Sequence, residues 1–222
     1  MDQTPVHEKH NTDLLAFIPP NASRIVEVGC SSGALAREYK KVNPTCQYTG
    51  IEISSEFAEL AQRYCDTVLV TDIESHTDRV LAHTAGSDCW IFGDSLEHLR
   101  DPWGLLRGIR ANIHKDGSVV ACIPNAQHWS LQLRLSCGDF RYEEMGLLDK
   151  THLRWFTRLT MLELFQSSGF NVVAGIPRIF PEPGREKFMP AIKLMAELAG
   201  ANPEVAVADA TPLQYVVRAV PV

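Results

Sequence analysis

No stretch of the sequence approaches the ~20 consecutive apolar residues that a membrane-spanning helix needs. The N-terminal residues, MDQTPVHEKHNTD, are polar and lack the apolar core of a secretory signal. These two absences predict a chain that works in the cytoplasm and has no membrane partner.

The cysteines form no metal-binding or disulfide pattern. The six cysteines lie far apart, and none of them form a C-x-x-C pair. This spacing argues against a zinc site and against a disulfide framework. Because most of the cysteines lie in apolar stretches such as CWIF and VVACIP, we expect free, buried thiols.

Positive charge is scarce as well. Lys and Arg total 21 against 27 Asp and Glu, which gives a formal net charge of −6, and no basic run breaks this balance. Binding to a nucleic-acid backbone relies on clustered Lys and Arg, so we expect no nucleic-acid partner. A local basic groove is the alternative that composition leaves open.

The sequence does contain a regular alternation of strand and helix patterns over 222 residues, which is enough for one sizeable domain. Strand patterns lie at 24–29, 47–54, 67–72, 87–94, 117–125, 171–176 and 213–220, and helix patterns lie at 33–42, 55–65, 74–84, 102–113 and 157–170. Such alternation predicts an α/β fold in which helices cover both faces of a doubly wound, parallel sheet. Ligands of such sheets bind beyond the carboxyl ends of the strands, where the strand order reverses.

Two segments break this alternation, and we interpret both as insertions in a single domain that spans 1–222. Residues 126–156 are rich in aromatic residues, His and Arg, and we expect them to form a lid over the substrate. Residues 177–212 contain a Pro-rich turn and an amphipathic helix near 186–199. That helix covers a sheet edge or forms the contact of a homodimer, and the sequence leaves both readings open.

The first strand runs directly into a glycine-containing loop, in RIVEVGCSSGAL at 24–35. A dinucleotide loop needs G-x-G-x-x-G/A, but Ser31 stands where the second glycine would allow a pyrophosphate to approach. A P-loop needs a Lys after its last glycine, and none follows Gly33. The remaining pattern, E-x-G-x-x-x-G, suits a cofactor without phosphates.

An acidic residue lies at or near the end of each of the first four strands, namely Glu27, Glu52, Asp72 and Asp94. A carboxylate such as Glu52 can accept both hydroxyls of a ribose in a bidentate, charge-assisted contact. Asp72 follows the third strand, where an adenine amino group would lie, and Asp94 would lie near the reactive end of the cofactor. A cationic nucleoside without phosphates matches this set, and S-adenosylmethionine is such a molecule.

The segments EVGCSSGALA, GIEIS, VTDIE and FGDSLEHLRDPW together resemble the class I S-adenosylmethionine-dependent methyltransferases over roughly residues 12–176. The stretch IPNAQHWSLQLRLSCGDFRYEEMGLLDKTHLRWFTR is similar to a bacterial subgroup associated with glycans and natural products. The resemblance implies a Rossmann-like sheet of seven strands, in which LQYVVRAV is antiparallel and lies between the fifth and sixth strands. It also implies that the cofactor contacts Gly29, Cys30, Gly33, Glu52, Ile53, Asp72, Ile73 and Asp94. We add Glu27 to this set, because it would hold the loop or meet the ammonium group of the cofactor.

Candidate residues for the acceptor side lie mostly in 126–156. His128 and His152 are the candidates for a general base, because a neutral imidazole can take a proton near pH 7. The expected substrate-binding residues are His98, Trp129, Tyr142 and Arg154. We expect no metal ion, since Asp149 and His152 have the spacing of a ligand pair but no third ligand is evident in the sequence.

We therefore predict an enzyme that moves the methyl group of S-adenosylmethionine to a small molecule, leaving S-adenosylhomocysteine. The favoured acceptor is a hydroxyl of a sugar or natural product, reached by in-line displacement with a histidine base. Methylation of nitrogen or carbon on a small molecule is the first alternative. A non-catalytic protein that binds S-adenosylmethionine and serves a partner is the second.

Overall fold

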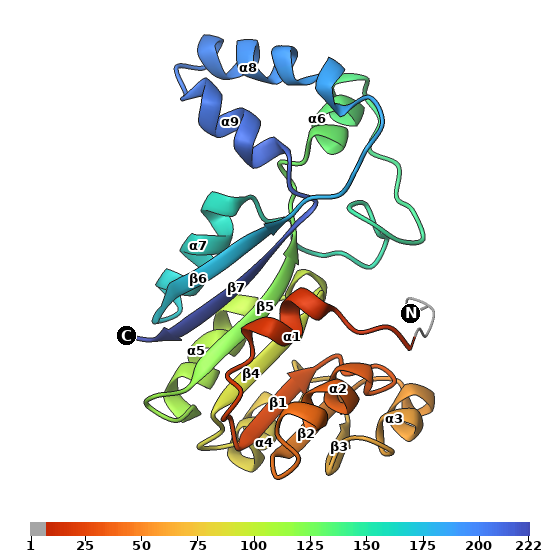
Figure 1. Cartoon of the computed structure of the whole chain (residues 1–222), viewed down its shortest axis with the longest axis vertical. Coiled ribbons are helices and arrows are strands. Elements are labelled where there is room, and N and C mark those ends of the chain that lie inside the picture. The colour runs from red at the N-terminus through yellow and green to blue at the C-terminus, as the bar shows by residue number, and fades with distance from the viewer. Residues whose placement is uncertain (1–7) are drawn as a thin grey trace.

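The computed structural model describes residues 8–222, and a seven-stranded sheet with the order β3-β2-β1-β4-β5-β7-β6 forms its centre (Figure 1). β7 is antiparallel to both of its neighbours, and the other strands are parallel to one another. The strands are β1 (Arg24–Val28), β2 (Gln47–Glu52), β3 (Thr67–Val70), β4 (Cys89–Gly93), β5 (Ser118–Pro124), β6 (Phe170–Arg178) and β7 (Gln214–Pro221). The predicted fold class is confirmed, including the antiparallel last strand between the fifth and sixth.

Helices cover both faces of this sheet. One core cluster joins α1, α2 and α3 to one face, and the other joins α4, α5 and α7 to the opposite face. The helices are α1 (Thr12–Phe17), α2 (Ala34–Val42), α3 (Ser55–Ala61), α4 (Thr77–His83), α5 (Pro102–Asn112), α6 (Trp129–Ser136), α7 (Arg158–Ser167), α8 (Met189–Leu198) and α9 (Pro203–Ala210), with short 3-10 helices η1 (Leu96–His98) and η2 (Arg185–Lys187).

Burial on both faces explains why the central strands are apolar throughout. In β4, Trp90 and Phe92 pack into one core cluster, while Cys89 and Ile91 pack into the other. A strand that is buried on both sides has no need for alternation between polar and apolar residues. This is why CWIF could be recognised as a strand of a parallel sheet.

Several elements differ from the sequence prediction. The six-residue α1 was not predicted, and α3 ends at Ala61 rather than near residue 65. β6 extends to Arg178, so the second insertion is shorter than 177–212. It contains two helices, α8 and α9, where one was expected.

The carboxyl ends of β1 and β4 form the point where the strand order reverses. β1 pairs with β2 on one side and with β4 on the other, so the connections that follow β1 and β4 lead away from each other. A crevice at such a point is the usual ligand site of an open α/β sheet. Figure 1 shows α6, α8 and α9 gathered beyond the end of β5, past the same edge of the sheet.

Among residues 8–222, no helix combines the length and the apolar character that crossing a bilayer would require.

Candidate functional site

The loop after β1 is tied to the end of β2 by backbone hydrogen bonds. The amides of Gly29 and Cys30 donate to the carbonyl oxygen of Ile51, at 2.8 and 3.2 Å. Gly29 and Gly33 have φ values of +74° and +76°, which a residue with a Cβ rarely adopts. The loop therefore turns sharply at both glycines and leads into α2.

The carboxylate of Glu52 fixes this loop from the neighbouring strand. It is 3% exposed; one oxygen accepts from the amide of Ser31 at 2.9 Å and the other from the amide of Ser54 at 2.9 Å. The same carboxylate thus holds both the loop after β1 and the residue that caps α3.

Glu27 lies in the sheet beside this loop and is buried. The hydroxyl of Tyr48 donates to its carboxyl group at 2.8 Å. Burial raises the pKa of Glu27 to about 8, and the charge of Glu52 adds to that effect. The carboxyl group of Glu27 is therefore protonated at neutral pH.

Asp72 follows β3 and organises the turn before α4. Its oxygens accept from the amide of Glu74 at 2.9 Å and from the hydroxyl of Ser75 at 2.7 Å. Burial opposes ionisation, but these hydrogen bonds and the charge of Arg100 outweigh it and lower the pKa of Asp72. The carboxylate is ionised at neutral pH.

The two isoleucines that the resemblance implicated differ in exposure. Ile73 is 5% exposed and belongs to the core, while Ile53 is 61% exposed just after β2. A contact of Ile73 with a ligand would therefore use its backbone, whereas Ile53 can offer its side chain.

Backbone strain is concentrated at the point where the strand order reverses. Within the described part of the chain, Ser31 after β1 and Asp94 after β4 are the non-glycine residues with positive φ, at 48° and 55°. The carboxylate of Asp94 accepts from Gln214 at the start of β7. Strained residues of this kind cluster at ligand sites because their surroundings must hold them in place.

An unpartnered hydroxyl lies beside the glycine loop. Ser95 Oγ is buried and has no hydrogen-bond partner among the described residues, and a Cβ added to Gly29 would lie 3.5 Å from the Cβ of Ser95. A buried hydroxyl without a partner is costly, so its presence here is consistent with a polar ligand between the ends of β1 and β4.

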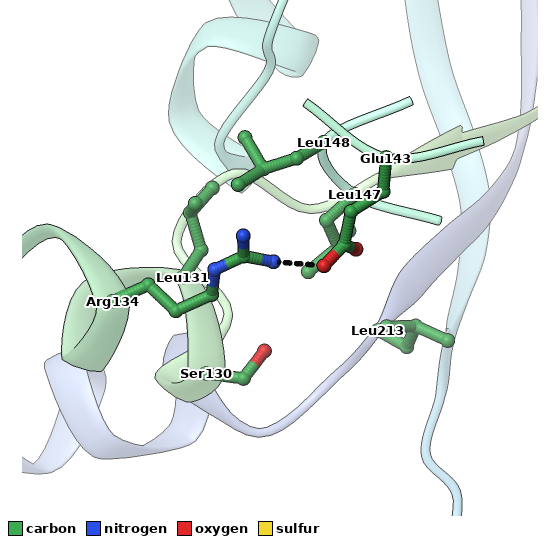
Figure 2. A pocket seen from close by; sticks show the side chains of 7 residues that line it. All are labelled: Ser130, Leu131, Arg134, Glu143, Leu147, Leu148 and Leu213. Carbon is green, nitrogen blue, oxygen red and sulfur yellow. Dashed lines mark hydrogen bonds and ion pairs between the residues drawn. The ribbon is translucent and has the colours of Figure 1, made fainter. Parts of the chain in front are cut away.

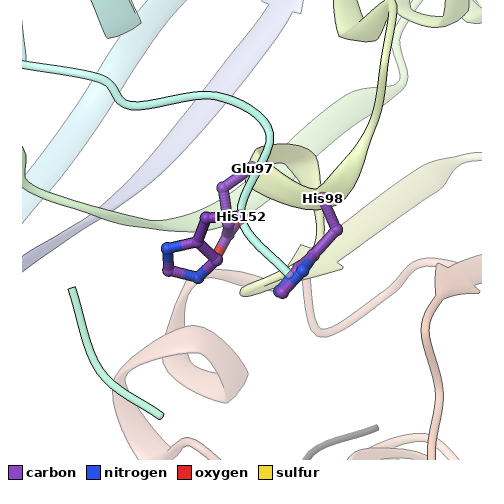
Figure 3. Close-up of side chains that lie close together, drawn as sticks. All are labelled: Glu97, His98 and His152. Carbon is purple, nitrogen blue, oxygen red and sulfur yellow. The ribbon is translucent and has the colours of Figure 1, made fainter. Parts of the chain in front are cut away.

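Glu97, His98 and His152 come together just beyond Asp94 (Figure 3). His152 is brought there because the amides of Leu153 and Arg154 donate to the carbonyl oxygen of Glu97, at 2.8 and 2.9 Å. The His98 and His152 rings meet edge to face, with centroids 4.8 Å apart.

Burial sets the protonation of this cluster. It lowers the pKa of both His98 and His152, and it raises the pKa of Glu97 well above its ordinary value. The imidazoles are therefore neutral at pH 7. Sequence reasoning missed Glu97, although its position beside His98 in SLEHL was a usable signal.

His128 lies in a different set of contacts. It is fully buried at the start of α6; Nδ1 contacts Ser130 Oγ at 2.8 Å, and Nε2 contacts Glu182 at 3.1 Å. The indole of Trp129 donates to the same carboxylate oxygen at 2.8 Å and stacks on Phe188. Both residues thus connect α6 to the segment that follows β6.

The other expected substrate-binding residues occupy separate positions. Tyr142 is 57% exposed and packs with Phe140 and Trp155 in an aromatic cluster. Arg154 donates to the carbonyl oxygen of Arg100 and lies over the ring of Trp103. Tyr142 is open to a ligand, while the guanidinium of Arg154 is engaged in bracing the chain.

A small cavity of about 160 Å³ opens between α6 and the remainder of residues 126–156, the segment that the sequence predicts to be a lid and that is called the lid segment below. Figure 2 shows the Arg134 side chain pointing across it to Glu143, an ion pair of 2.6 Å. The cavity is lined by Ser130, Leu131, Arg134, Glu143, Leu147, Leu148 and Leu213. Its wall at Leu147 is shared with His152, whose ring contacts the Leu147 carbonyl oxygen.

Residues 7–174 match the sequence model of a family described as a methyltransferase domain. The chain belongs to this family. The match covers the glycine loop, the strand-end carboxylates, η1 and the lid segment. A comparison with curated proteins found no match.

Solved methyltransferase structures have the same fold at low sequence identity. One, an S-adenosylmethionine-dependent methyltransferase from Thermotoga maritima, is 17% identical, with 94% of this chain and 86% of that chain covered and a TM-score of 0.60. Magnesium protoporphyrin IX methyltransferase from Synechocystis, with bound S-adenosylhomocysteine, is 13% identical, with 95% and 81% covered and a TM-score of 0.60. The plantazolicin methyltransferase, in complex with S-adenosylhomocysteine, is 16% identical, with 90% and 76% covered and a TM-score of 0.57.

Proposed function

We propose that this methyltransferase-domain protein transfers the methyl group of S-adenosylmethionine to a hydroxyl of a small molecule. The observation that carries the proposal is the glycine loop after β1, held by Glu52 beside the unpartnered hydroxyl of Ser95. Neighbours of the same fold hold S-adenosylhomocysteine, the product of such a transfer.

The residues present suit this cofactor. Glu52 would accept the ribose hydroxyls, and the ionised Asp72 with the backbone of Ile73 would meet the adenine. Gly29, Cys30 and Gly33 would border the amino-acid end, with the exposed Ile53 packing against the adenosine. Glu27, protonated in the protein alone, would release its proton when the cofactor's ammonium group approached, since a nearby positive charge favours the carboxylate.

The lid segment is the proposed acceptor site. It offers the cavity beside Leu147, the exposed ring of Tyr142 and the adjoining aromatic cluster. Plantazolicin methyltransferase and magnesium protoporphyrin IX methyltransferase are named for small-molecule acceptors, which supports an acceptor of that class. The expected homodimer and cytoplasmic location stay predictions.

Of the two candidate histidines, we favour His152 as the one on which activation of the acceptor depends. Its Nδ1 is 3.3 Å from the carbonyl oxygen of Leu147. Because a carbonyl can only accept, Nδ1 carries the proton and Nε2 keeps a lone pair. His128, in contrast, has both ring nitrogens engaged and would act by positioning α6.

The sulfonium group of the cofactor already makes a good leaving group, so the chain's main task is alignment and exclusion of water. The acceptor oxygen would attack the methyl carbon in line while the carbon–sulfur bond breaks. Removal of the hydroxyl proton adds about 10²–10⁴-fold to the rate, the usual contribution of general base catalysis.

Transfer of a labelled methyl group from S-adenosylmethionine to a panel of hydroxyl, amine and carbon acceptors tests this function. We expect label on a hydroxyl compound, a kcat reduced about 10²-fold or more in His152→Gln, and a smaller change in His128→Gln. Binding of S-adenosylmethionine is measured in each variant as the control. Label only on amines would replace the hydroxyl assignment with the nitrogen alternative, and an unchanged kcat in both variants would exclude His128 and His152 as groups on which activation of the acceptor depends.

A further inference from the structure

We propose that Glu97, His98 and His152 bind one divalent transition-metal ion at the acceptor side of the site. The metal site itself stands on the geometry of these residues, and only its role in activating a hydroxyl rests on the proposed function. It goes against our expectation from the sequence, which lacked a third ligand beside His152.

The three side chains offer their ligand atoms to a common point. One atom from each lies within 4.8 Å of the others, and His152 Nε2 is 4.0 Å from Glu97 Oε1. Ligands at about 2.1 Å from a metal ion lie about 3–3.5 Å from one another. The three side chains would therefore draw together by roughly an ångström on binding an ion.

Both histidines are already oriented in the way that metal-binding histidines usually are. His98 Nδ1 lies 3.2 Å from the carbonyl oxygen of Thr151, and His152 Nδ1 lies 3.3 Å from that of Leu147. A ligating histidine commonly donates its other ring N–H to a carbonyl or carboxylate, which fixes the ring and its tautomer. Here those bonds leave a lone pair on each Nε2 atom, and that of His152 lies 4.0 Å from Glu97 Oε1.

Glu97 supplies the second, independent observation. Its side chain is buried, with the residue 1% exposed, and neither carboxyl oxygen has a hydrogen-bond partner among the described residues. A buried carboxyl group in that state is costly unless something else satisfies it. Figure 3 shows the group directed at His152, where a cation would satisfy it.

Further negative charge surrounds the cluster. Asp94 and Asp149 are close enough to act electrostatically on Glu97, and Asp149 acts likewise on both histidines. One carboxylate and two imidazoles form a donor set that favours Zn²⁺, Co²⁺, Fe²⁺ or Mn²⁺ over Mg²⁺ and Ca²⁺, which prefer oxygen ligands alone. Three protein ligands leave positions open for an acceptor.

The bound ion would serve the acceptor rather than the cofactor. A hydroxyl bound to the ion loses its proton to water more readily, and its oxygen then forms a bond to the methyl carbon as the carbon–sulfur bond breaks. The electron pair of that bond returns to sulfur. His152 would then act as a ligand that holds the ion, and the acceptor would be activated through the ion.

Metal binding can be measured without any acceptor. Protein freed of metal with a chelator is titrated with Co²⁺, and visible absorption reports its coordination. We expect one equivalent to bind with bands typical of a nitrogen- and oxygen-ligated ion. Glu97→Gln, His98→Gln and His152→Gln should each weaken binding at least tenfold, while His114→Gln, at an exposed histidine, should bind as the wild type does.

Calorimetry with S-adenosylmethionine on the same samples separates this inference from the proposed function and shows which variants are folded. Wild type that binds S-adenosylmethionine but no Co²⁺ would overturn the metal site alone, as would folded His98→Gln and His152→Gln variants that bind Co²⁺ normally. Wild type that binds one Co²⁺ but no S-adenosylmethionine would support the metal site and contradict the proposed function.

Discussion

Gly33 combines an unusual backbone conformation with a close approach between two helices. Its φ is +76°, and an added Cβ would lie 3.1 Å from Cα and 3.3 Å from the carbonyl oxygen of Ala61 in α3. Backbone atoms cannot rotate away as a flexible side chain can. The spacing of the glycines in the loop is therefore required by packing as well as by any ligand.

Replacement of Gly33 by alanine tests this reading. We expect Gly33→Ala to lower the free energy of unfolding by about 3 kcal/mol or more, from conformational strain plus the clash. The control is Gly138→Ala, because Gly138 has φ of +74° but nothing within 4 Å of an added Cβ; it should cost only about 1–2 kcal/mol. Urea unfolding measures both, and equal costs would show that contact with Ala61 is unimportant.

Glu27 makes stability depend on pH in a direction opposite to that of most carboxyl groups. Its pKa is raised from an ordinary 4.5 to about 8 by burial. Below pH 4.5 the group is protonated in both states and no penalty arises. As pH rises toward 8 the unfolded chain ionises first, so the folded state is progressively destabilised, by about 3–5 kcal/mol in total.

The variant Glu27→Gln should remove this pH dependence, because glutamine stays neutral and can still accept from Tyr48. We expect the stability of wild type relative to Glu27→Gln to fall steadily between pH 5 and pH 8 in denaturant titrations without ligand. Glu163→Gln, on the exposed side of α7, serves as the control and should follow the wild type. Parallel curves for wild type and Glu27→Gln would contradict the assigned protonation.

At the scale of elements, a single carboxylate joins α6 to the segment after β6. Glu182 accepts from Trp129 and contacts the buried ring of His128. Removing this carboxylate leaves Nε2 of His128 and Nε1 of Trp129 without their partner, which typically costs about 1–3 kcal/mol. We therefore expect Glu182→Ala to destabilise the protein by this amount and to speed amide exchange in α6.

Glu186→Ala provides the matched control for this change, because the Glu186 side chain is 81% exposed and forms its ion pair with the adjacent Arg185. Its effect should lie within about 0.5 kcal/mol of zero. The bracing role of Glu182 would be contradicted if Glu186→Ala sped amide exchange in α6, or if Glu182→Ala left that exchange unchanged.

Helices and strands could be predicted from the sequence where burial alone determines the residue pattern, and less well elsewhere. The central strands followed from apolar, β-branched runs, since both of their faces are covered. The helix α9 was missed, although Asn202 caps it and Pro203 occupies its first turn, which is a recognisable start signal. The short α1 depends on packing against the sheet, because six residues are too few to form a stable helix alone.

The residues proposed for the cofactor side could be placed near one another from the sequence, unlike those proposed for the acceptor side, for a topological reason. Parallel strands end at a common edge, so acids at strand ends must lie near one another. No such rule connects His152 to Glu97 and His98. Their meeting depends on how the lid segment folds back on η1 through the backbone bonds of Leu153 and Arg154, which no local pattern in the sequence specifies.

For the whole molecule, the two halves of the proposed site come from different parts of the chain. The cofactor side is built from the connections after β1, β2, β3 and β4, and the acceptor side from the lid segment. The seven-stranded order followed from the resemblance, whereas alternation of patterns alone predicted a parallel sheet. The central claim is that the first of these halves holds S-adenosylmethionine.

Calorimetric titration with S-adenosylmethionine and S-adenosylhomocysteine tests that claim most directly, on wild type, Glu52→Ala and the exposed control Glu56→Ala. The account predicts micromolar binding of both ligands, unchanged by Glu56→Ala and weakened at least tenfold by Glu52→Ala, with the fold of each variant checked by circular dichroism. Well-folded wild type that binds neither ligand would contradict the account and leave the loop after β1 as a structural turn between a strand and a helix.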